Sequence, residues 1–103
     1  MRTEIKYTDN YIHDLFIKCG LDENIYPYTL SGLLMFLSKN HIYVKVIDTD
    51  KNRYYYSVLD YNFLTGDMEL VSEDLNDYET FYEALEYGII EGICYLSNKL
   101  KIK

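Results

Sequence analysis

Carboxylate side chains are concentrated in one stretch of this chain, and no basic residue accompanies them there. Between Tyr54 and Asn98 the sequence has ten Asp and Glu residues and no Lys or Arg. A surface of one sign repels nucleic acid and attracts basic proteins. We expect such a surface to bind a basic partner protein; the alternative is a solvated face that keeps a small domain soluble. The residues predicted to form the partner-binding surface run from the third strand into the last helix: Glu69, Glu73, Asp74, Asp77, Glu79, Glu83 and Glu86.

Histidine and cysteine side chains offer little for catalysis or metal binding. His13 and His41 lie on different predicted elements, and the sequence has no HExxH, CxxC or paired-histidine spacing. Cys19 and Cys94 fall on or beside predicted buried stripes, where a thiol is inert. There is also no Gly-rich phosphate loop and no Ser-His-Asp signature. We expect a protein that is not an enzyme and that uses no metal and no cofactor.

Three consecutive tyrosines, Tyr54 to Tyr56, raise the possibility of nucleic-acid binding, because aromatic side chains on a sheet can stack unpaired bases. The expected order of elements is also similar to that of double-stranded RNA binding domains. Binding of that kind needs Lys and Arg against the phosphates, and this region has none. A nucleic-acid binder is therefore the disfavoured alternative.

Two amphipathic helices are expected in the first 40 residues. The first spans residues 8–20, with capping oxygens at Thr8 to Asn10 and Gly20 after its end. The second spans residues 29–40, with Thr29 as N-cap and leucines at a helical period behind it. Gly32 inside this helix is either tolerated or allows another segment to approach closely.

From Ile42 the apolar period changes to two, which predicts strands at residues 42–48, 53–61 and 67–73. Turns are expected at residues 48–52 and 65–67, and the third strand is expected to be the shortest. A final helix is predicted over residues 80–99, opening with a capping box formed by Thr80 and Glu83. Gly88 and Gly92 lie on its apolar stripe, so we expect close packing on the sheet rather than an oligomer contact. That buried stripe is predicted to comprise Phe81, Ala84, Leu85, Gly88, Ile89, Gly92, Ile93 and Leu96.

These elements predict an α+β fold: a three-stranded antiparallel β-meander with helices packed on one face, in the order α-α-β-β-β-α. With 103 residues and a net charge of −7, the chain is expected to form one domain over residues 1–103. No signal peptide and no apolar run of the roughly 18–20 residues that span a bilayer is evident. We expect a cytoplasmic protein with reduced thiols.

From Thr29 onward the sequence resembles small orphan proteins of bacteriophages and prophages of gut bacteria. The likeness rests on an amphipathic helix, a Tyr-rich β-meander and the closing segment TFYEALEYGI at Thr80 to Ile89, which matches T-x-x-E-A-L-E-x-G-I. These motifs specify a capped helix and its packing face, so they assign no activity to any residue. The resemblance implies a mobile-element accessory protein in the host cytoplasm, a class that often inhibits host machinery.

The function expected from the sequence is therefore that of a small acidic protein-interaction module. It would bind, and by doing so inhibit, a basic nucleic-acid-handling defence protein of the host, in the manner of a DNA mimic. The alternative is a structural domain that self-associates, for example as a homodimer, through its tyrosines and an apolar sheet face.

Overall fold

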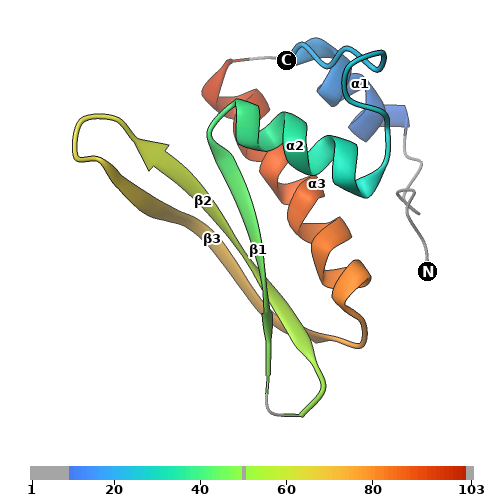
Figure 1. Cartoon of the computed structure of the whole chain (residues 1–103), viewed down its shortest axis with the longest axis vertical. Coiled ribbons are helices and arrows are strands. Elements are labelled where there is room, and N and C mark those ends of the chain that lie inside the picture. The colour runs from blue at the N-terminus through green and yellow to red at the C-terminus, as the bar shows by residue number, and fades with distance from the viewer. Residues whose placement is uncertain (1–9, 50, 102–103) are drawn as a thin grey trace.

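The computed structural model describes residues 10–49 and 51–101, and only the backbone of residues 10 and 75–77 among them. Its order of elements, α-α-β-β-β-α, confirms the predicted α+β fold (Figure 1). The elements are α1 (Asn10–Lys18), α2 (Leu30–Lys39), β1 (Ile42–Asp48), β2 (Tyr54–Asn62), β3 (Asp67–Tyr78) and α3 (Phe81–Lys99). The predicted caps Thr8 and Asp9, and Asp50 of the predicted turn, lie outside the described residues.

The three strands form an antiparallel meander in the order β1-β2-β3. β1 and β2 pair in regular register from Ile42 opposite Asp60 to Asp48 opposite Tyr54. β3 was predicted to be the shortest strand and to end near residue 73; it is the longest and ends at Tyr78. Its pairing with β2 is irregular at two places, and one is a bulge that leaves Val71 as an extra residue between the paired Leu70 and Ser72.

The end of α1 and both ends of α2 follow the predicted signals. Gly20 has a φ of 104° after α1, a conformation that side chains disfavour. The Thr29 hydroxyl accepts a 3.1 Å hydrogen bond from the amide of Gly32, which confirms the predicted N-cap of α2. Gly32 is required for close approach, because a β-carbon there would overlap the backbone carbonyl of Pro27.

The closing helix lies on the sheet at its two glycines. A β-carbon at Gly88 would overlap the side chain of Val44 and lie 3.2 Å from the ring of Tyr56. One at Gly92 would lie 3.1 Å from a methyl group of Leu37. Close packing within the chain is thus confirmed. The predicted buried stripe is also confirmed except at Phe81, which is exposed at the start of the helix.

All helices lie on one side of the sheet (Figure 1). α2 packs against β1, α3 packs against β1 and β2, and α1 packs against α3. The core between these layers includes the fully buried side chains of Phe16, Leu33, Leu37, Ile89 and Ile93. The other face of the sheet carries no described helix, and within the described residues no helix is long and apolar enough to cross a membrane.

Candidate functional site

A pocket of about 360 Å³ separates β3 from α3. It is lined by residues of both elements: Val71, Ser72, Glu91, Cys94, Tyr95 and Asn98. The pocket exists because α3 lies deepest against β1 and β2, where its glycines allow close contact, and therefore stands further from β3.

Helical and strand periods place carboxylates and tyrosines on the sides of α3 and β3 that border the gap between them; of these, Glu91 and Tyr95 line the pocket itself. Residues four apart lie on one face of a helix, about 6 Å apart along its axis, and α3 carries Glu83, Tyr87, Glu91 and Tyr95 at that spacing. On β3, Glu69 and Asp74 oppose Asp60 and Tyr56 of β2, two residues whose side chains point toward α3. We call the following set the acidic strip: Glu69, Asp74, Glu83 and Glu91, with Tyr78, Tyr87 and Tyr95 between them.

Glu91 is at the centre of the acidic strip. The hydroxyl of Ser72 donates a 2.6 Å hydrogen bond to its Oε1 atom. Burial, and then the nearness of this same carboxylate, raises the pKa of the Tyr56 hydroxyl. Oε2 is buried and accepts no hydrogen bond from a described residue. A carboxylate oxygen without a donor strengthens the negative potential of the pocket.

The two ends of the strip differ in charge. At one end the Tyr78 hydroxyl donates a 2.6 Å hydrogen bond to Asp74, and the ring of Tyr78 stacks on Tyr87 with centroids 5.2 Å apart. At the other end Tyr95 donates to Asp60 at 2.6 Å. Lys99 bonds both carboxylate oxygens of the same Asp60, at 3.0 and 3.1 Å, so this carboxylate is neutralised.

Hydroxyl and thiol groups beside the strip titrate at raised pH because the negative form of each is disfavoured. Hydrogen bonding to Asp60, burial and nearby carboxylates raise the pKa of Tyr95 to about 12. Burial and hydrogen bonds to carboxylates raise the pKa of Tyr78 and of Tyr56. Burial, and then the charge of Glu91, raises the pKa of Cys94. The Cys94 thiol is therefore a poor nucleophile although it lines the pocket.

Only part of the predicted partner-binding surface comes together. Glu69, Asp74 and Glu83 lie in the acidic strip. Glu73 opposes Ser57 and accepts a 3.2 Å hydrogen bond from it, which places Glu73 on the opposite face of the sheet. Strand alternation is the reason, because neighbouring residues of a strand point to opposite faces. The prediction of one continuous surface is therefore wrong.

The remaining predicted residues also lie away from the strip. Glu86 is 4% exposed, so it cannot present its charge to a partner. Glu79 is exposed at the far end of β3 and lies 3.7 Å from Arg53, the basic residue of the neighbouring hairpin. The side chain of Asp77 lies outside the described residues. The acidic strip instead includes Glu91, which is not among the residues predicted from the sequence. Its spacing of four residues from Tyr87 and eight from Glu83 would have placed it on the same face of α3.

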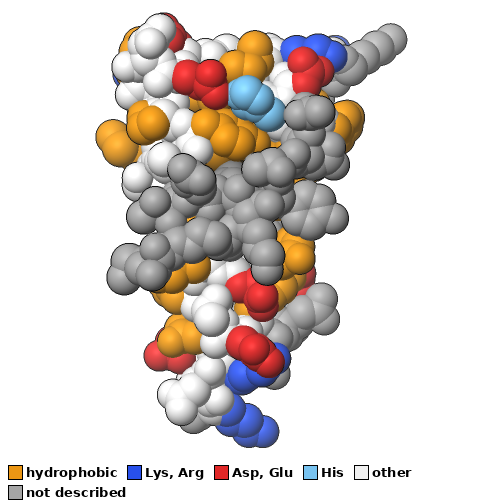
Figure 2. Space-filling model, turned by 90° about the vertical axis from the view of Figure 1, so that its right-hand side faces the viewer, with side chains coloured by type: hydrophobic (Ala, Val, Ile, Leu, Met, Phe, Trp, Pro, Cys, Tyr) orange, Lys and Arg blue, Asp and Glu red, His pale blue; other side chains and the backbone are white. Residues whose placement is uncertain are grey.

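On the face shown in Figure 2, the Asp and Glu side chains of the described residues are separated from one another, and some lie beside Lys or Arg side chains. One such pair is Lys18 Nζ and Asp14 Oδ2, which are 2.9 Å apart. Nε2 of His13 lies 2.6 Å from Oε1 of Glu23, and the His13 ring lies against Tyr28 with centroids 4.5 Å apart and the ring planes tilted by 55°. Across residues 10–49 and 51–101, no group of three or more His, Cys, Asp or Glu side chains is arranged to hold a metal ion.

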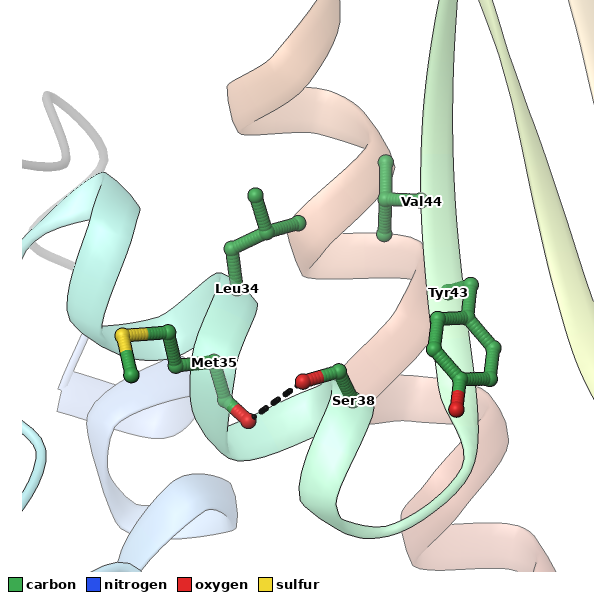
Figure 3. A pocket seen from close by; sticks show the side chains of 5 residues that line it. All are labelled: Leu34, Met35, Ser38, Tyr43 and Val44. Atoms are coloured by element: carbon green, nitrogen blue, oxygen red, sulfur yellow. Dashed lines mark hydrogen bonds between the residues drawn. The ribbon is translucent and has the colours of Figure 1, made fainter.

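A second pocket, of about 280 Å³, lies between α2 and the outer edge of β1 (Figure 3). Leu34 and Val44 border it above, and Tyr43 and Ser38 border it below. The Ser38 hydroxyl is already used, since it donates to the backbone carbonyl of Met35 at 2.8 Å. The lining is almost entirely apolar, so this pocket carries no charged group for chemistry.

Comparisons with protein-family models, curated proteins and solved structures find no match to this chain. The resemblance to phage and prophage proteins therefore stays a prediction. The functional argument rests on the geometry of the acidic strip.

Proposed function

We propose that this protein is a non-catalytic interaction module whose acidic strip binds a basic segment of another protein. The observation that carries the proposal is that Glu83 and Glu91 share one face of α3 while Glu69 and Asp74 share the helix-facing side of β3. Of these carboxylates, Glu91 lines the pocket between the two elements. Carboxylates of this kind attract Lys and Arg side chains over several ångströms and accept their hydrogen bonds.

The tyrosines of the strip favour the same ligand. The stacked rings of Tyr78 and Tyr87 offer an aromatic face next to carboxylates, and cations bind such faces.

A partner segment in an extended conformation fits the spacing of the strip residues along α3. Alternate side chains of an extended chain are about 6.7 Å apart, and residues four apart on a helix are about 6 Å apart along the axis. A segment with Lys or Arg at every second position would therefore match the interval of Glu83, Tyr87 and Glu91. Together with the phage-type resemblance, this chemistry favours a nucleic-acid-handling host protein whose basic surface the strip would occupy and inhibit.

The test is binding of a fluorescent peptide with Arg at alternate positions to the full chain. We expect binding that weakens steeply by about 0.5 M salt, because exposed ion pairs are screened. The double variant Glu83→Gln/Glu91→Gln should reduce the affinity at least about tenfold, as expected from the loss of two charge-assisted contacts.

Glu73→Gln/Glu79→Gln is the matched control, because it removes the same two charges at positions away from the acidic strip. Equal losses in the control and in the double variant would show that only net charge matters and would refute the acidic strip as a site. Binding that persists unchanged in high salt would refute the electrostatic mechanism.

A further inference from the structure

The sheet face opposite the helices forms a second surface, separate from the acidic strip. Strand register arranges its residues in rows across β1, β2 and β3. Leu59 lies beside Leu70, Tyr61 beside Met68, and Ile47 beside Tyr55. No described helix covers these rows (Figure 1).

This open face carries several exposed apolar side chains. Leu70 is 59% exposed and Met68 is 45% exposed. The face continues into the β2–β3 turn, where Phe63 packs on Tyr61 with centroids 4.9 Å apart and Leu64 is 97% exposed. Contiguous apolar side chains on a surface mark a site of association.

One charged row crosses the middle of this face. Lys45 on β1 and Glu73 on β3 both lie beside Ser57 of the central strand. Each is therefore one strand spacing, about 4.8 Å, from the line of β2. Lys45 is exposed and forms no ion pair with a described residue. The row thus carries opposite charges at equal distances from the centre of the sheet.

Such a row is complementary to itself. A two-fold axis parallel to β2 exchanges β1 and β3 between two facing sheets, so Lys45 of each copy meets Glu73 of the other. The same rotation sets Leu59 against Leu59 and Tyr61 against Tyr61. An axis across the strands would instead set Lys45 against Lys45, and like charges oppose association.

We propose that a second copy of this chain docks on the open sheet face to form a two-fold symmetric dimer, with β1 of each copy over β3 of the other. The two sheets form an aligned sandwich, with strand directions offset by about 30°. The Lys45–Glu73 contacts determine the direction of the two-fold axis. The apolar rows provide the surface that is buried between the two copies.

The test is sedimentation velocity of the full chain up to about 100 µM, a range in which moderate interfaces associate. The wild type is expected to associate with concentration. Lys45→Glu and Glu73→Lys should each raise the dimer dissociation constant at least about tenfold, because both contacts become repulsive. An equimolar mixture of the two variants should form a heterodimer, and the double exchange Lys45→Glu/Glu73→Lys should restore the homodimer.

Lys51→Glu and Glu79→Lys are the matched controls, since they make the same charge changes away from the open face. A wild type that stays monomeric at the highest concentration would overturn the proposal. So would a dimer that tolerates both single reversals, because it would form elsewhere. Failure of the mixed variants to associate, with both folded by circular dichroism, would exclude the proposed axis.

Discussion

Oγ of Ser72 on β3 lies 2.6 Å from Oε1 of Glu91 on α3, and this hydrogen bond crosses the pocket that otherwise separates the two elements. It is the geometric centre of the acidic strip. The bond fixes one oxygen of the carboxylate, and the other is left buried without a donor from the described residues.

Ser72→Ala should lower the free energy of unfolding by about 1–2 kcal/mol, because it removes a donor from a partly buried carboxylate. In a double-mutant cycle with Glu91→Gln, we expect a coupling energy of about 1 kcal/mol. Urea unfolding of the four proteins measures it. A coupling energy indistinguishable from zero would mean that the bond does not join β3 to α3 in solution.

Gly88→Ala should destabilise the protein although alanine is the better helix former. The helix gains about 1 kcal/mol in propensity, but the added methyl overlaps Val44 and crowds Tyr56, which costs about 1–3 kcal/mol. Gly92→Ala should be milder, because its nearest neighbour is the end of the Leu37 side chain at 3.1 Å. Thermal or urea unfolding would contradict the packing described here if the order of the two variants were reversed.

Thr80→Ala should cost about 1 kcal/mol of stability by removing the cap of α3. The Thr80 hydroxyl accepts a 3.0 Å hydrogen bond from the amide of Glu83, and no other hydroxyl takes its place in the variant. Thr80→Ser keeps the acceptor and serves as the control. Equal stability of the alanine and serine variants would show that the cap contributes nothing.

Stability should fall as the pH rises from about 10 to about 12, in part because of Tyr95. The pKa of Tyr95 is near 10 in its ordinary state and is raised to about 12 in the fold. Below pH 10 the Tyr95 hydroxyl keeps its proton in both the folded and the unfolded protein, so its full contribution to stability is present. Between the unfolded and the folded pKa, Tyr95 loses its proton in the unfolded chain first, and unfolding is therefore favoured.

Urea unfolding at pH 9 and 11.5 tests this dependence, with Tyr95→Phe expected to lose less stability than the wild type over that range. An identical pH profile for Tyr95→Phe and the wild type would contradict the assigned role of the Tyr95–Asp60 hydrogen bond.

Most of the fold follows from local patterns in the sequence. The alternation from Ile42 onward specifies a strand, and the structure has β1 there. The two threonine caps specify the starts of α2 and α3, and the glycines of the last helix specify close packing; all three features are present. β3 was underestimated because its second half contains Asp and Asn, which have low strand propensity. Its pairing with β2 as far as Tyr78 overrides that preference.

The candidate site was harder to predict because it depends on which way side chains point. The bulge at Val71 changes the alternation of β3 by one residue, and nothing in the sequence marks it. Glu86 was grouped with Glu83 by closeness in sequence. A helix turns about 100° per residue, which directs Glu86 away from Tyr87 and Glu91 and into the protein.

The absent side chains at Gly88 and Gly92 have an effect beyond the residues that they touch. They let one flank of α3 sink onto β1 and β2, and the gap on its other flank opens in compensation. The width of the pocket between α3 and β3 is therefore set in part from the far side of the helix. If the acidic strip binds a basic segment as proposed, a single methyl group at position 88 would change the affinity from a distance, without altering any residue of the strip.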